Sequence, residues 1–116
     1  MTGVPEQVRR AIEADCARLI NLYANLNDAG DWPAVAALYA EDGLMTRPTA
    51  PDQPIVGREA ILAGFLARPA RTTRHIVGNV VIDVETATEA TCLAACEVGT
   101  KSVWLKGNIR REPDSS

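Results

Sequence analysis

The sequence predicts an α+β fold, with helices at the N-terminal end and antiparallel strands after them. Apolar residues near the N-terminus recur every three or four positions, which is the spacing of one helix face. Residues 72–84 are instead rich in β-branched side chains, and residues 91–98 alternate along the chain as a strand does. The predicted order is α–α–β–(β)–α–β–β–β, in which the bracketed strand is left open.

Length and composition narrow the class of protein. The chain has 116 residues, of which 47% are hydrophobic and 23% charged, with a net charge of −3. These values predict one globular domain over residues 1–116. No basic block marks a nucleic-acid binder, and no apolar run approaches the roughly 20 residues of a membrane span. The N-terminus lacks an apolar signal segment, so we expect the cytoplasm.

The first helix is expected from about Pro5 to about Ala29. Proline suits a first helical turn, and Gly30 suits the position after the last one. The apolar face comprises Val8, Ile12, Cys16, Leu19, Tyr23 and Leu26.

A second helix is predicted to follow at once and to end at Gly43. Asp31 is a good N-cap, because its carboxylate accepts hydrogen bonds from first-turn N–H groups. Pro33 again lies in a first turn.

Residues 44–47 are predicted to form a short strand. The next residues, RPTAPDQP, contain three prolines and are expected to be irregular, because proline does not occur in the middle of a sheet. Residues 57–67 are predicted to form a third helix, with an apolar face made of Ile61, Leu62, Phe65 and Leu66.

Three strands are predicted for the rest of the chain. The first covers residues 72–84, with a bulge or bend at Gly78. A hairpin loop at 86–89 leads to a strand at 91–98, with Cys92, Ala94, Cys96 and Val98 on one face.

A turn at Gly99–Lys101 is predicted to lead to the last strand, residues 102–111, before a polar tail. Cysteines are three in number and lack metal-type spacing. We therefore expect them to be small buried residues in a reducing compartment.

Three segments together resemble a known family. LYANLNDAGDWPAVAALYAEDGLMTRP, IVGREAILAGFLAR and TRHIVGNVVIDV are similar to the SnoaL-like branch of the nuclear transport factor 2-like superfamily. The similarity spans about residues 8–84. It depends on Tyr23, Asp28, Asp31, Trp32, Asp42, Gly43, Gly57, Arg58, Glu59, Ile61, Arg74, His75 and Asn79.

This resemblance implies a cone-shaped, half-open barrel of three helices and a curved antiparallel sheet around an apolar pocket. The superfamily includes scytalone dehydratase, a dehydrochlorinase and ketosteroid isomerases. It also includes non-catalytic members such as dioxygenase β subunits. The fold by itself therefore does not decide the function.

His75 is the only histidine. It is either a satisfied core or rim histidine or a general acid or base, since imidazole ordinarily titrates near pH 6.5. The resemblance implies the second role, with an aspartate from the end of the first helix as its partner. That aspartate is Asp28, which by itself could also be a solvated charge in a helix-ending turn.

Tyr23 either packs in the core or, as the resemblance to ketosteroid isomerases implies, donates a hydrogen bond to a developing oxyanion. Arg47 occupies the place of the aspartate base of those enzymes, so steroid isomerisation is not predicted. The predicted substrate-binding residues are Leu26, Trp32, Tyr39, Phe65, Val77 and Asn79. Asn79 shares the strand face of His75 unless a bulge at Gly78 intervenes.

No cofactor or metal is expected. A metal site at Cys92 and Cys96 would need ligands that one histidine does not supply, and no glycine-rich phosphate loop is present. The C-terminal end supplies one strand fewer than the family usually has. An exposed sheet edge invites pairing with another chain, so a homodimer or higher oligomer is expected.

Two functions remain open from the sequence. The first is a cofactor-independent lyase or isomerase that uses His75, Asp28 and Tyr23 on a small apolar molecule. The alternative is a non-catalytic ligand-binding or oligomerisation module that resembles dioxygenase β subunits.

Overall fold

The structure, a computed structural model, describes residues 3–99 and 101–110, and only the backbone of Ser102. The described chain divides into two compact units. One comprises Tyr23–His75 and is named the dyad unit after Asp28 and His75, which both belong to it. The remainder forms the other, the sheet unit. The single domain over residues 1–116 stays a prediction, and the predicted polar tail lies outside the described residues.

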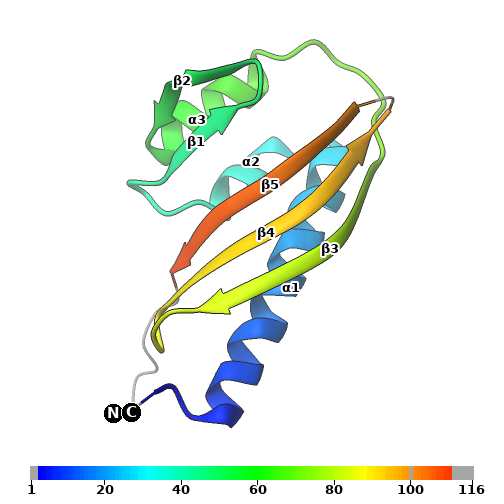
Figure 1. The fold of residues 1–116 in the computed structure, drawn as a ribbon. Helices are drawn as coiled ribbons and strands as arrows, with labels where there is room; N and C mark the ends of the chain where they lie inside the picture. The colour runs from blue at the N-terminus through cyan, green and yellow to red at the C-terminus, as the bar shows by residue number, and fades with distance from the viewer. Residues whose placement is uncertain (1–2, 100, 111–116) are drawn as a thin grey trace. The chain divides into compact units, whose positions relative to one another are not determined.

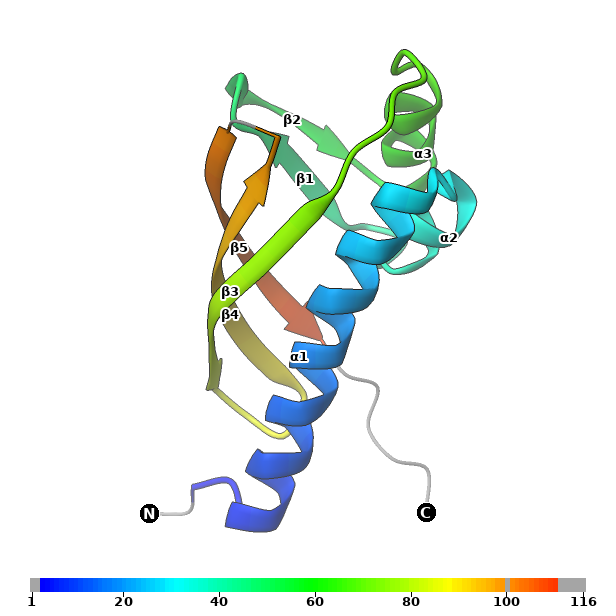
Figure 2. The same cartoon turned by 90° about the vertical axis from the view of Figure 1, so that its right-hand side faces the viewer.

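The sheet unit contains the first part of helix α1 (Glu6–Ala29) and three strands. In Figure 1 and Figure 2 this part of α1 runs along one face of the curved three-stranded sheet. Ile12 and Cys16 of the helix form a buried cluster with Ala90 of the sheet. The cluster is completed by partly buried apolar side chains from both elements, namely Val8, Ile82, Val84 and Ile109. The predicted apolar helix face is therefore confirmed at these positions.

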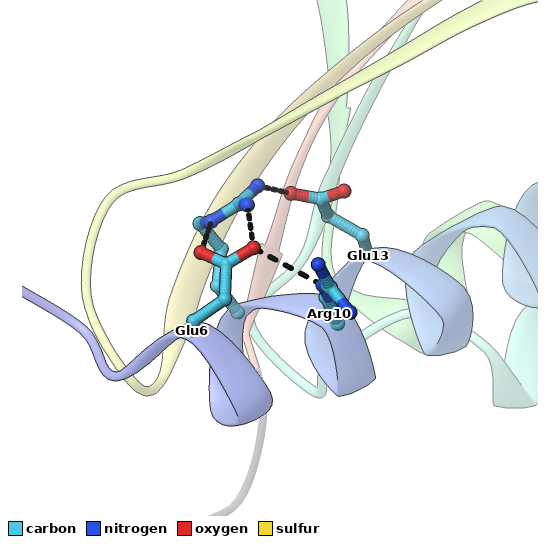
Figure 3. Close-up of polar contacts among 4 residues, drawn as sticks. Glu6, Arg10 and Glu13 are labelled. Atoms are coloured by element: carbon cyan, nitrogen blue, oxygen red, sulfur yellow. Dashed lines mark hydrogen bonds and ion pairs between the residues drawn. The ribbon is translucent and has the colours of Figure 1, made fainter.

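Charged residues stabilise the first turns of α1. Glu6 accepts hydrogen bonds from Arg9 and Arg10, and Arg9 also pairs with Glu13 (Figure 3). These residues are three or four positions apart, so their side chains meet on one side of the helix. Hydrogen bonds from the two arginines hold the pKa of Glu6 below its usual range.

Strands β3 (His75–Val84), β4 (Glu89–Val98) and β5 (Lys101–Arg110) form the sheet in that order. β4 and β5 are antiparallel, with Glu89 opposite Arg110 and Val98 opposite Lys101. Every second side chain of β4 points into the core. Ala94 and Cys96 are buried, as the alternation predicts, whereas Cys92 and Val98 of the predicted face are half-buried. Ala90 extends the buried row. Within the described residues β3 and β5 are the outer strands of this sheet.

The irregularity expected in β3 lies at Asn79 rather than at Gly78. Asn79 has a φ of 53°, in the left-handed region that asparagine tolerates better than most residues. The alternation of exposed and partly buried residues shifts between these two positions. Asn79 is exposed and does not share the strand face of His75, which is the alternative that the sequence left open for an irregular strand.

The dyad unit contains α2 (Trp32–Ala37), which is shorter than predicted. The Oδ1 atom of Asp31 accepts a hydrogen bond of 3.3 Å from the backbone N–H of Ala34, which confirms the predicted cap. The chain then turns through Ala40–Gly43 before the next strand. A Cβ at Gly43 would lie 2.9 Å from the Ala40 oxygen, so only glycine fits this turn.

A two-stranded antiparallel sheet follows, made of β1 (Leu44–Arg47) and β2 (Ala50–Val56). Residues 50–56 were expected to be irregular, but they form a strand. Both strands of a two-stranded sheet are edges, and an edge tolerates the prolines of β2.

Helix α3 (Arg58–Leu66) begins after Gly57, whose φ of 94° favours glycine. Val35, Met45, Ile61 and Phe65 make the buried core of this unit. In the part of the chain that the structure describes, no helix is both long and apolar enough to cross a membrane.

Candidate active site

Asp28 and His75 meet within the dyad unit, although 47 positions separate them in the sequence. Asp28 lies near the C-terminal end of α1, and His75 is the first residue of β3. The Nδ1 atom of His75 lies 2.5 Å from Oδ1 of Asp28. The backbone N–H of His75 donates to Oδ2 over 2.8 Å, and the hydroxyl of Thr73 donates to Oδ1 over 2.9 Å.

The protonation of this pair follows from the donors around Asp28. Burial raises the pKa of Asp28, but hydrogen bonds from the His75 backbone, the His75 ring and Thr73 outweigh it and leave the pKa below its usual range. Asp28 is therefore a carboxylate at neutral pH and only accepts hydrogen bonds. The Nδ1 atom of His75 must then carry its hydrogen.

The other ring nitrogen of His75 is left available. Nε2 has a lone pair in this tautomer, and within the described residues it has no hydrogen-bond partner. The His75 side chain retains 22% of its exposure, so a small molecule or a water can reach the ring. This arrangement can accept a proton at Nε2 while Asp28 stabilises the resulting imidazolium.

A second polar pair is formed by Tyr23 and Tyr39. Their hydroxyl oxygens lie 2.8 Å apart, and their rings meet edge to face with centroids 5.9 Å apart. Burial, together with the neighbouring Tyr23, raises the pKa of Tyr39. Tyr39 is therefore a neutral phenol at pH 7, and one O–H of the pair is used between the two hydroxyl groups. The remaining O–H is free to donate to a third oxygen.

Two further hydrogen bonds hold the tyrosine backbones. The side-chain amide of Asn27, a buried polar residue, donates to the carbonyl of Tyr23 over 2.8 Å. Arg58 Nε donates to the carbonyl of Tyr39 over the same distance. These two hydrogen bonds restrain the backbone at Tyr23 and Tyr39, from which the paired hydroxyl groups project.

The predicted wall residues of this unit pack around one aromatic stack. Trp32 lies flat on Phe65, with ring centroids 5.2 Å apart and planes 9° apart. Leu26, Tyr23 and Tyr39 pack against the same buried cluster. Phe65 itself is only 1% exposed and belongs to the core, so its contact with a ligand stays a prediction.

Val77 and Asn79 belong to the sheet unit, so their part in lining a pocket also stays a prediction. The sequence did not single out Thr73 or Asn27. Thr73 precedes His75 by two positions, and Asn27 precedes Asp28 by one. Both are short polar residues close in sequence to Asp28 or His75, and this property could have identified them.

A pocket of about 190 Å³ lies within the sheet unit. Its lining is mostly apolar and includes Ile12, Cys16, Leu19, Ala90 and Ile109. Cys16 and Cys96 are buried, as expected, whereas Cys92 is only half-buried. Burial raises the pKa of Cys16 and Cys92. Among residues 3–99 and 101–110, no three histidine, cysteine or carboxylate side chains gather as a metal site would require.

The chain is similar to known proteins in its sequence and in its fold. The sequence profile described as the SnoaL-like domain matches residues 9–105. A solved structure of a candidate scytalone dehydratase from Novosphingobium aromaticivorans is 21% identical, with a TM-score of 0.73, over 90% of this chain and 74% of that one.

Two other solved structures extend this comparison. A protein of unknown function with a cystatin-like fold, from Nostoc punctiforme, is 22% identical with a TM-score of 0.73, over 94% and 84% of the two chains. A candidate ketosteroid isomerase from Kribbella flavida is 20% identical with a TM-score of 0.55, over 82% and 67%. These similarities confirm the α+β fold. No curated protein that was compared matches the chain.

Proposed function

The chain belongs to the SnoaL-like domain family, and from this premise we propose that it is a cofactor-independent lyase or isomerase of the dehydratase or dehydrohalogenase kind. Its substrate would be a small, mostly apolar molecule with an acidic C–H bond. The observation that carries the proposal is the contact of His75 Nδ1 with Asp28, which leaves Nε2 unpartnered within the described residues. A histidine that only filled the core would gain nothing from a free, accessible Nε2.

In the proposed reaction, Nε2 of His75 removes a proton from carbon. The electron pair of that C–H bond forms either a C=C bond, as a neighbouring leaving group departs, or an enolate. Asp28 keeps the ring in the required tautomer and stabilises the imidazolium. The free O–H of the Tyr23–Tyr39 pair donates to the leaving group or to the enolate oxygen.

Deuterium exchange tests proton removal without knowledge of the leaving group. The protein is incubated in D₂O with acetophenone, cyclohexanone or 3-benzoylpropionate, and loss of the α-proton signal is followed by NMR. We expect exchange above the buffer rate for at least one ketone. His75→Gln should lower that rate by about a hundredfold or more, because general-base catalysis contributes on that scale.

The matched variants separate the dyad from general effects on folding. Asp28→Asn should lower the exchange rate by about tenfold or more, since the imidazole loses its orienting carboxylate. Asp83→Asn changes an exposed aspartate of β3 and should leave the rate unchanged. Equal exchange by the wild type and by folded His75→Gln would sink the proposal.

A second proposal concerns the oligomer. β5 is an outer strand within the described residues, and Trp104 on it is 63% exposed. An exposed aromatic on an outer strand suits a second copy of the chain, as the alternative of an oligomerisation module requires. Size-exclusion chromatography with light scattering at micromolar concentration should give a dimer or larger. A monomer that Trp104→Lys does not change would contradict this proposal.

A further inference from the structure

Arg47 and Arg68 of the dyad unit have no negative partner among the described residues. Arg47 ends β1, and Arg68 follows α3. Both are half-buried, and neither makes an ion pair with a carboxylate of the described chain. The Nε atom of Arg47 is buried and has no hydrogen-bond partner among the described residues. A buried N–H that is left without an acceptor costs free energy, so this group is suited to an acceptor from outside the chain.

The two guanidinium groups lie at the same end of α3. Nη2 of Arg47 is 2.9 Å from the point that a Cβ on Gly64 would occupy. Gly64 lies in the last turn of α3, and Arg68 comes two residues after the helix ends, so both positions are at its C-terminal end. Glycine is less favourable than alanine in a helix interior. Here it leaves the space through which the Arg47 side chain passes.

Arg68 also lies against the aromatic cluster. Its guanidinium carbon is 4.5 Å from the centroid of the Phe65 ring, which in turn stacks on Trp32. Burial lowers the pKa of Arg68, and the positive charge of Arg47 lowers it further. Tyr23 and Tyr39 act on Arg68 in the opposite direction, so the tyrosine pair is also within electrostatic reach.

Two neighbouring positive charges with no counter-charge repel each other, and an anion between them removes the repulsion. Guanidinium groups recognise carboxylates through paired, charge-assisted hydrogen bonds. The half-buried ring of Trp32, which stacks on the buried Phe65, offers a flat apolar surface to the rest of such a molecule. A carboxylate on an apolar or aromatic body matches both features, whereas inorganic phosphate matches only the charge.

We propose that Arg47 and Arg68 bind the carboxylate group of the substrate, which therefore carries a negative charge at one end of an apolar body. This inference rests on the proposed function, because it takes the bound molecule to be the substrate from which His75 would remove a proton. The binding of a carboxylate to the two arginines is measured without any reaction.

Binding is measured by the fluorescence of Trp32. The chain has two tryptophans, so Trp104→Phe leaves Trp32 as the single emitter. In this background benzoate should quench or shift the emission at lower concentration than benzamide, its neutral analogue. Benzamide that binds as tightly as benzoate would overturn the inference, and so would inorganic phosphate that displaces benzoate at equal concentration.

Arginine variants identify the site. Arg47→Gln and Arg68→Gln should each weaken benzoate binding by about tenfold or more and leave benzamide unchanged, because a charge-assisted hydrogen bond is lost. Arg18→Gln, which changes an exposed arginine of α1, is the matched control and should bind benzoate as the parent does. Unchanged benzoate affinity in both folded arginine variants would overturn the inference.

Gly64→Ala is a second test that removes no charge. The added methyl group would meet the flexible end of Arg47, so the side chain moves and the helix is kept. Benzoate affinity should fall while the unfolding midpoint stays the same or rises. A Gly64→Ala protein that binds benzoate like the parent would contradict the placement of Arg47.

The tests of this inference and of the proposed function have different outcomes. In deuterium exchange with 3-benzoylpropionate and its methyl ester, Arg47→Gln should raise the KM for the acid only, whereas His75→Gln should slow exchange in both. If His75→Gln slows exchange but the arginine variants keep their preference for the acid, the carboxylate inference fails and the proposed function stands. If no ketone exchanges but the arginine variants lose benzoate affinity, the proposed function fails and the carboxylate site stands.

Discussion

Replacing Asp28 with asparagine tests the geometry of the dyad by its effect on stability. The Asp28 carboxylate accepts three hydrogen bonds, two from His75 and one from Thr73. An asparagine has one acceptor oxygen and one NH₂ group. In either orientation of the amide, the NH₂ group faces at least one of these donors, and that hydrogen bond is lost.

The magnitude follows from the kind of bond that is removed. A hydrogen bond to a charged group contributes about 1.5–3 kcal/mol, and the Asp28 side chain is only 14% exposed, so water does not replace it fully. We therefore expect Asp28→Asn to lower the free energy of unfolding by about 2 kcal/mol at pH 7. The midpoint of urea unfolding should fall accordingly, with an unchanged slope.

The pH dependence gives the prediction its sign. The pKa of Asp28 is lower in the folded chain than in the unfolded chain, where an aspartate titrates near about 3.9. The stability that Asp28 contributes is present above that unfolded value and is lost as the pH falls through the folded value. The difference between wild type and Asp28→Asn should be complete at pH 7 and pH 5. It should shrink at pH 3.

Urea titrations followed by circular dichroism at the three pH values measure this difference. Asp83→Asn, on the exposed side of β3, serves as the control and should change the free energy of unfolding by less than about 0.5 kcal/mol. An Asp28→Asn effect below about 0.5 kcal/mol at pH 7, or one as large at pH 3 as at pH 7, would refute the described hydrogen-bond arrangement.

Three other expectations follow from single contacts. Tyr39→Phe removes the 2.8 Å hydrogen bond to Tyr23 and should lower the free energy of unfolding by about 1 kcal/mol. Because burial raises the pKa of Tyr39, the parent should also lose stability above about pH 10, where the phenol of the unfolded chain ionises. Tyr39→Phe should not show this loss, and thermal melts at a series of pH values would measure it. Asn79→Ala places alanine at a φ of 53° and should cost about 1 kcal/mol in urea unfolding, whereas Gly78→Ala meets no atom within 4 Å and should stabilise or leave stability unchanged. Cys92 is half-buried, which raises its pKa, so its alkylation by iodoacetamide at pH 7 should be slower than that of a free cysteine; equal rates would contradict this partial burial.

The elements that the sequence predicted correctly depend on local geometry. The apolar spacing predicted α1, and Asp31 predicted the start of α2, because helix period and capping involve only neighbouring residues. The alternation in β4 predicted which of its side chains are buried for the same reason. The end of α2 was predicted too late, because turns at Ala40–Gly43 compete locally with the helix.

The contacts of the candidate site were less accessible to prediction. The pairing of Asp28 with His75 came from the resemblance, since no local rule relates two residues 47 positions apart. Thr73, and the arginines at positions 47 and 68, were not predicted as site residues. Their significance depends on which atoms lie near them and on which partners they lack. Neither property produces a regular pattern in the sequence.

By itself the sequence determined the fold class, most of the helices and strands, and the residue types available for proton transfer. Backbone hydrogen bonding and side-chain spacing act over a few residues, so a pattern of letters is enough to reveal them. Only the tertiary structure decided that Asp28 holds the Nδ1 hydrogen of His75, that Asn79 rather than Gly78 takes the left-handed conformation, and that the prolines of β2 lie in an edge strand. These outcomes depend on the path of the whole chain, because that path sets the distance between groups far apart in the sequence. The position of a proton and the energy of an unpaired charge both depend on that distance.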